Sequence, residues 1–125
     1  MFKIDDKKTI HITRGDIGTM NVKAKDQEGG EYEFKANDIV RFSIYEKGNM
    51  AKVIRQIEKT VESATTTVAI NLTSEETRIG DIINKPVNYW YEIQLNPDTN
   101  PQTIVGYDIE GAKLFILYPE GAEQE

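Results

Sequence analysis

The sequence predicts an all-β fold, an antiparallel sandwich of two sheets built from about seven strands. The first observation behind this prediction is composition. Ile occurs 16 times and Thr 11 times, whereas Leu occurs only 4 times, and β-branched side chains suit the pleated surface of a strand. The second observation is that apolar and polar residues alternate in short segments separated by clusters of Gly, Pro, Asn and Asp.

Each alternating segment places its apolar side chains on one face. Val40, Phe42 and Ile44 share a face of one segment, opposite Arg41 and Ser43. A period of two is typical of a strand with one buried face. The predicted strands are 9–13, 20–25, 40–45, 50–59, 68–73, 89–95 and 113–118.

Two segments have patterns that are also typical of a helix. The segment 50–59 has apolar residues at helical spacing, but turn residues precede it and its neighbours are strands, so we expect a hairpin strand. Thr73 followed by Glu76 has the spacing of a capping box, which predicts at most one short helical turn near 74–78. We expect a single domain over 1–125, with its core at about 9–119 and a polar tail at 120–125.

Composition excludes several function classes. The chain of 125 residues carries a net charge of −6, which argues against nucleic-acid binding because that depends on clustered Lys and Arg. The charge is uneven, since residues 61–125 hold 11 acidic and 3 basic side chains. We expect this half to be a solvated surface, and the alternative is that it faces a basic neighbour. The chain has no Cys and one His, so we expect no metal site, no cofactor and no catalysis. No segment is apolar enough to predict a membrane span, and the charged N-terminal segment does not resemble a signal peptide.

Short motifs in the chain favour structural interpretations. Arg14-Gly15-Asp16 matches an integrin-binding tripeptide, but we expect a turn between the first two strands. The oxygen-rich segment 96–100 could hold calcium, yet its prolines and missing bidentate Glu favour a tight turn. The carboxylate pairs Asp5-Asp6 and Glu75-Glu76 have no apolar surroundings that would raise a pKa, and they carry no catalytic prediction.

Trp90 has two possible roles. Alternation places it on the face opposite Tyr89 and Tyr91, so the tyrosines belong to the core and Trp90 covers a neighbouring strand or forms a contact with a partner. The alternative is a platform on which a sugar ring stacks.

The order of segments resembles a known family. The telling elements are the turn Ile70-Asn71-Leu72-Thr73-Ser74-Glu75-Glu76-Thr77, the strand Tyr89-Trp90-Tyr91-Glu92-Ile93-Gln94-Leu95, and Thr103-Ile104-Val105-Gly106. Over roughly residues 9 to 121 the chain is similar to the N-terminal domain of phage baseplate upper proteins and to tail-associated proteins of phages and prophages of Gram-positive bacteria. The resemblance implies an immunoglobulin-like β-sandwich that serves as an assembly module, and it transfers no catalytic residues.

We therefore predict a structural phage or prophage tail or baseplate protein that acts by protein–protein contacts, without catalysis. Its expected partners are other tail or baseplate proteins and further copies of itself, with no nucleic acid and no membrane. It would be made in the bacterial cytoplasm and reside in the virion tail once assembled. Trp90, Tyr45 and Tyr107 are the predicted contact residues, because aromatic side chains dominate interface energetics. The alternative function is a carbohydrate-binding or adhesin-type sandwich that uses Trp90 as the platform.

Overall fold

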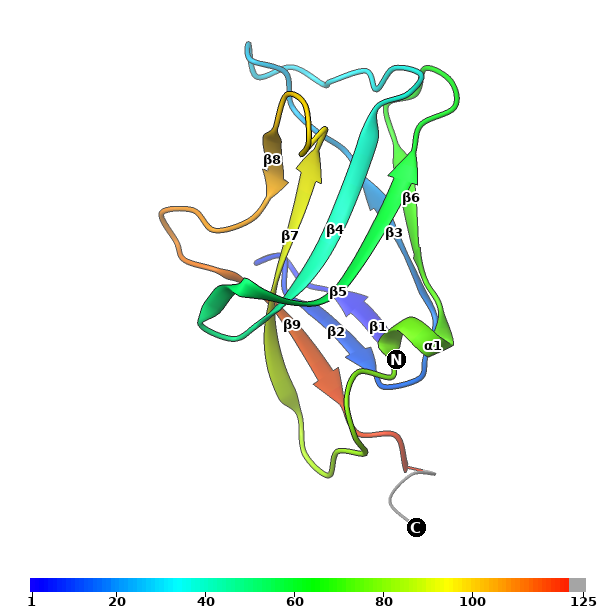
Figure 1. The fold of residues 1–125 in the computed structure, drawn as a ribbon, viewed down its shortest axis with the longest axis vertical. Coiled ribbons are helices and arrows are strands. Elements are labelled where there is room, and N and C mark those ends of the chain that lie inside the picture. The colour runs from blue at the N-terminus through cyan, green and yellow to red at the C-terminus, as the bar shows by residue number, and fades with distance from the viewer. Residues whose placement is uncertain (122–125) are drawn as a thin grey trace.

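Two β-sheets facing each other form the protein. A computed structural model describes residues 1–121, so residues 122–125 of the polar tail predicted at 120–125 lie outside the described residues. Figure 1 shows β3 and β6 side by side, with the larger sheet beside them. The strands are β1 (Phe2–Ile4), β2 (Ile10–Thr13), β3 (Gly18–Val22), β4 (Ile39–Glu46), β5 (Asn49–Thr60), β6 (Val68–Leu72), β7 (Val87–Leu95), β8 (Gln102–Val105) and β9 (Lys113–Tyr118).

The sheet order confirms the predicted all-β sandwich. The larger sheet runs β1-β2-β9-β7-β4-β5, with β8 paired to the second half of β7, and the smaller sheet pairs β3 with β6. The strands β9, β7, β4 and β5 thus lie next to one another and face β3 and β6, which makes a sandwich of two sheets. One detail of the prediction is wrong: the sheets are not purely antiparallel, because β2 pairs with β9 in parallel.

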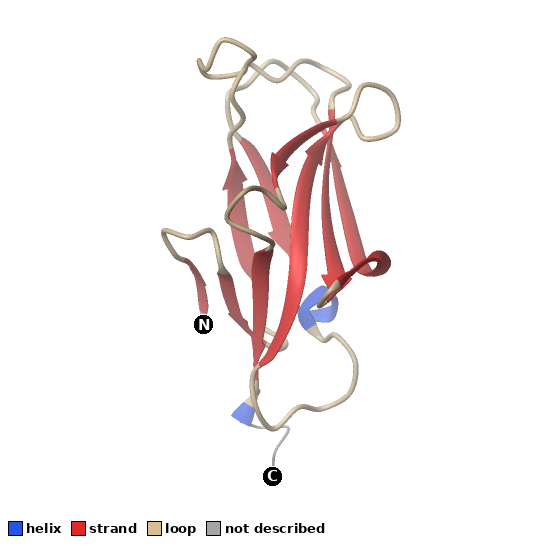
Figure 2. Ribbon diagram, turned by 90° about the vertical axis from the view of Figure 1, so that its left-hand side faces the viewer, coloured by secondary structure: helices blue, strands red, loops and turns tan. Residues whose placement is uncertain are grey.

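Two strands were not predicted from the sequence, whereas two less certain elements were predicted correctly. β1 and β8 are short strands that the alternation did not reveal, so the described residues hold more strands than the seven expected. The ambiguous segment 50–59 is a strand, as predicted, within β5. The predicted helical turn is α1 (Ser74–Thr77), where Thr73 and Glu76 form both hydrogen bonds of a capping box. Figure 2 shows this turn as a short helix in a fold made mostly of strands. Among the described residues, no helix is long and apolar enough to cross a membrane.

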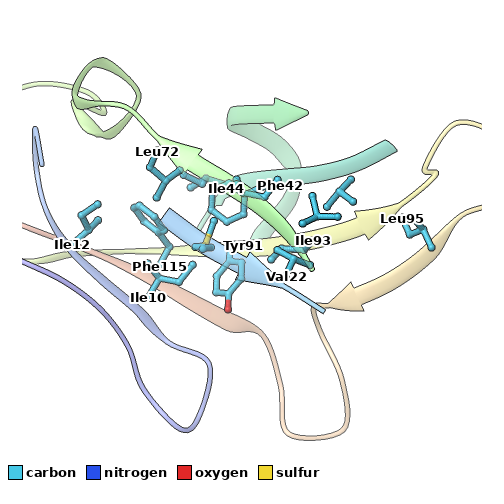
Figure 3. Packing of buried hydrophobic residues seen from close by; sticks show 14 of the residues in the cluster. Ile10, Ile12, Val22, Phe42, Ile44, Leu72, Tyr91, Ile93, Leu95 and Phe115 are labelled. Carbon is cyan, nitrogen blue, oxygen red and sulfur yellow. The ribbon is translucent and has the colours of Figure 1, made fainter. Parts of the chain in front are cut away.

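The core lies between the two sheets. Figure 3 shows side chains of β3 and β6, such as Val22 and Leu72, among those of the larger sheet, such as Phe42 and Phe115. The faces predicted from alternation are the buried ones: Val40, Phe42 and Ile44 are at most 1% exposed. This confirms which face of the predicted strand points inwards. The candidate site described below lies on the opposite face of the larger sheet.

The Arg14-Gly15-Asp16 tripeptide forms the predicted turn, and its arginine is inaccessible. Arg14 is only 6% exposed, and its Nη2 donates a hydrogen bond to the Gly80 carbonyl at 2.7 Å. The Gly15 amide donates to Thr77 Oγ1 at 3.0 Å, and that hydroxyl donates to the Asp16 carbonyl at 2.8 Å. The turn therefore fastens the β2–β3 connection to α1 and to the loop that follows it.

Candidate protein interface on the outer sheet face

Four apolar side chains lie in register across the larger sheet on the face that points away from the core. Tyr45 of β4 pairs with Trp90 of β7, and Trp90 pairs with Leu114 of β9. On the other side, Val53 of β5 pairs with Tyr45 where the register between β4 and β5 shifts. Directly paired residues project from the same face of a sheet, so these side chains form a continuous row. We call Val53, Tyr45, Trp90 and Leu114 the outer row.

Tyr107 joins the outer row from the loop between β8 and β9. Its ring lies 5.8 Å from the Trp90 ring, centroid to centroid, in an edge-to-face arrangement. In Figure 1 this loop (orange) projects to the left, on the side away from β3 and β6. The three predicted contact residues Trp90, Tyr45 and Tyr107 are therefore brought together on one face.

Gly106 allows the loop to pass close over β7. A Cβ atom at this position would lie 2.8 Å from Thr103 Cγ2 and 3.3 Å from Glu92 Cγ. The first distance is shorter than side chains tolerate, so a larger residue would push the loop outwards. The absence of a side chain at Gly106 thus positions Tyr107 against Trp90.

Glu92 holds the other aromatic residue of the row in place. The Tyr45 hydroxyl donates a hydrogen bond to Glu92 Oε1 at 3.0 Å. Burial and the nearby Glu92 carboxylate both raise the pKa of Tyr45, so the hydroxyl keeps its proton and remains a donor. Tyr45 is only 8% exposed, so it is a buried member of the outer row and offers little accessible surface.

The accessible parts of this surface lie around the half-buried Trp90. Val53 is 47% exposed, Tyr107 is 62% exposed, and Ile109 at the tip of the loop is fully exposed. The tip is a tight turn in which the amides of Asp108 and Gly111 donate to each other's carbonyls, and Lys113 Nζ lies 2.9 Å from Asp108 Oδ2.

Leu114 lines a hollow of about 570 Å³ beside the loop. In the described part of the chain, no further layer covers this face. Sequence reasoning missed Val53, Leu114 and Ile109, whose positions depend on register and loop path.

Gly106→Val is expected to move Tyr107 away from Trp90 with little loss of global stability, because the new side chain collides with Thr103 and Glu92. Trp90 is the only tryptophan, so its fluorescence reports the change directly, and we expect a red-shifted emission. Gly121→Ala is the matched control, since a Cβ there meets nothing within 4 Å. An unchanged Trp90 spectrum in Gly106→Val would contradict the proposed path of the loop.

The single histidine lies in a hydrogen-bonded chain on the same sheet face. His11 Nε2 lies 2.9 Å from Asp5 Oδ2, and His11 Nδ1 lies 2.7 Å from the Tyr118 hydroxyl. The hydrogen bond from His11 is the main reason why the pKa of Asp5 lies below its ordinary value. Both ring nitrogens are occupied by these partners, and the arrangement links the β1–β2 turn to β9. These two hydrogen bonds give His11 a structural role.

The segment 96–100 is a tight turn, as predicted, and its polar groups are used within the fold. The amides of Thr99 and Asn100 donate to the Asn96 carbonyl, and Asp98 Oδ2 lies 2.7 Å from Arg41 Nη2. Asn96 Nδ2 donates to Asp38 Oδ1 at 3.1 Å. Within residues 1–121, no group of three or more His, Asp or Glu side chains is placed to hold a metal ion.

Acid is expected to destabilise the protein partly through Asp38. Burial raises the pKa of this carboxyl, but hydrogen bonds from the Lys35 amide, Asn96 and Tyr32 outweigh burial, so the pKa lies below its ordinary value. A lowered folded-state pKa means that the stabilisation is present above the unfolded-state pKa of about 3.9 and is lost as the pH falls through the folded-state pKa. Urea unfolding between about pH 6 and pH 2 should show this loss.

The Asp38→Asn variant tests the assignment. It cannot titrate at this position, so its unfolding free energy should depend less on pH in the acid range than that of the wild type. An equally steep dependence in both proteins would show that Asp38 does not contribute.

Comparison with known proteins finds no match for this chain among family models, curated proteins or solved structures. The outer row and the sequence resemblance described above are therefore the grounds on which a function can be assigned.

Proposed function

We propose that this protein is a structural assembly module of a phage or prophage tail or baseplate, which acts through protein–protein contacts and without catalysis. The observation that carries the proposal is the outer row with Tyr107 against it. Three aromatic residues chosen from the sequence as contact residues form one surface, although they come from three different parts of the chain.

The character of this surface supports a protein partner. Its centre combines the indole of Trp90 with the ring of Tyr107, and aromatic residues are enriched at the energetic centres of protein interfaces. Polar and charged side chains flank the apolar centre: Glu92 occupies the next outward-facing position, where it pairs with the buried Ser43, and Arg41 and Gln94 follow. An apolar centre with a polar rim is the usual anatomy of a protein interface.

The β5 edge of the larger sheet is less suited to contacts than its face. β5 is one of the two strands that end the sheet, the other being β1, and it carries Lys52, Arg55, Glu58 and Lys59 along its length. Charged side chains on an edge strand oppose the addition of another strand. We therefore assign the contact to the sheet face.

The test compares Trp90→Ala and Trp90→Phe with the wild type. Light scattering of the chain mixed with each product of the neighbouring tail genes should show a complex that Trp90→Ala abolishes and that Trp90→Phe weakens less. Genes for a tape-measure or portal protein are expected beside the gene of this chain. A glycan array should show no binding. Saturable sugar binding by the monomer that is lost in Trp90→Ala would overturn the proposal in favour of the sugar-platform alternative.

A further inference from the structure

The surface around the outer row carries acidic side chains that are not balanced by bases. Residues 88–112, which include most of β7, all of β8 and the loops that follow them, contain Glu92, Asp98, Asp108 and Glu110 but no Lys or Arg. Two of these acids have basic partners elsewhere in the fold: Asp98 pairs with Arg41 at 2.7 Å, and Asp108 pairs with Lys113 at 2.9 Å.

The other two acids leave negative charge at the apolar surface. Glu92 accepts the Tyr45 hydrogen bond, and its neighbour Gly106 leads directly to Tyr107. Glu110 lies beside the exposed Ile109 at the tip of the loop. Neither carboxylate forms an ion pair within the described residues.

The bases near the row are matched or outnumbered by acids. Arg41 is shared between Glu58 and Asp98, so this group has a net negative charge, and Lys52 lies 3.8 Å from Glu46. Lys7 lines the hollow beside Leu114, but Asp6 and Glu110 line the same hollow. When a second copy of the chain is placed on this face, it brings the same acidic rim against Glu92 and Glu110. Like charges facing each other across an interface disfavour that complex.

We propose that the outer row and the 106–112 loop receive a different protein, whose contact surface has an apolar centre flanked by Lys or Arg. This inference rests on the proposed function and specifies the chemistry of its partner. Glu92 and Glu110 would pair with the basic rim, while Trp90, Tyr107 and Ile109 contact the apolar centre. Self-association of the chain would then use another surface.

Two matched peptides test the charge preference. The first alternates lysine with leucine, and the second has glutamate in place of every lysine. Trp90 fluorescence follows binding at the surface itself, since no other tryptophan is present. The lysine peptide should give a saturable change that weakens with added salt, and the glutamate peptide should bind far less.

Charge-removing variants locate the effect. Glu92→Gln and Glu110→Gln should each weaken binding of the lysine peptide by up to about fivefold at low salt, the range of an exposed ion pair. The exposed Glu33, which lies outside β7, β8 and their loops, provides the control Glu33→Gln, which should bind like the wild type. Since Glu92→Gln also alters the Tyr45 contact, Glu110→Gln provides the independent measurement.

Equal binding of both peptides, no binding of either, or equal weakening by Glu33→Gln would overturn the inference. A dimer seen by light scattering that Trp90→Ala dissociates would also overturn it, while leaving the proposed protein-contact function intact. Sugar binding at Trp90 would instead overturn the proposed function itself.

Discussion

Phe115→Ala is expected to lower the free energy of unfolding by about 3–5 kcal/mol, the range for removing a buried phenylalanine. Phe115 has no exposed surface, and its ring lies 6.2 Å from that of Phe42. It lies in β9, between β2 and β7, and the larger sheet is continuous through this strand. The cavity would therefore open at the centre of the sandwich. Urea denaturation followed by circular dichroism measures the loss.

Ile116→Ala is the matched control on the same strand. Ile116 points to the outer face and is half-buried, so its truncation leaves less cavity and should cost less than about 2 kcal/mol. If the two variants lost the same stability, the inner and outer faces assigned to β9 would be wrong.

Arg14→Met is expected to cost about 2–3 kcal/mol of stability, the second largest effect. The Arg14 guanidinium is buried, and its Nε and Nη2 donate to the carbonyls of Ile79 and Gly80 at 3.4 and 2.7 Å. Methionine fills a similar volume but leaves both carbonyls without these charged donors. Ile79 is buried, and an unsatisfied buried carbonyl costs more than the net gain from an ordinary hydrogen bond, whereas Gly80 is exposed and its carbonyl can bond water. Thermal unfolding should show a lower midpoint.

Arg41→Met provides the comparison for a more accessible arginine. Arg41 pairs with Glu58 and Asp98, whose side chains are 43% and 69% exposed, and solvent screens such pairs. We expect a loss of about 1 kcal/mol or less. A larger loss for Arg41→Met than for Arg14→Met would contradict the role given to the buried arginine.

Local sequence signals predicted most of the fold. Alternation identified the inward faces of β4, β6 and β7, and the spacing of Thr73 and Glu76 identified α1, because both signals depend on neighbours in the chain. β1 was missed because three residues are too short to show a period, and β8 was missed because its residues, two polar followed by two apolar, do not alternate. The parallel pairing of β2 with β9 joins distant segments, and local pattern does not specify it.

The candidate site was predictable only in part. Trp90 and Tyr45 were chosen as aromatic residues on strands, and their pairing follows from the register of β4 and β7. The approach of Tyr107 depends on the path of a loop over Glu92, which the lack of a side chain at Gly106 permits. Arg14 was expected in an ordinary turn, yet its burial arises from contacts with Ile79 and Gly80, more than 60 residues away. Such contacts are set by tertiary packing and have no local signal.

Cross-linking mass spectrometry of purified phage tails, from the strain that encodes this chain, tests the assembly role most directly. Lys52 precedes Val53 of the outer row in β5 and Lys23 follows β3 of the smaller sheet, and their side chains are similarly exposed, at 62% and 64%. If the outer face holds a tail protein, Lys52 should cross-link to that protein more often than Lys23 does. Absence of the chain from the particles, or cross-links to other tail proteins through Lys23 alone, would contradict the proposed role of the outer row.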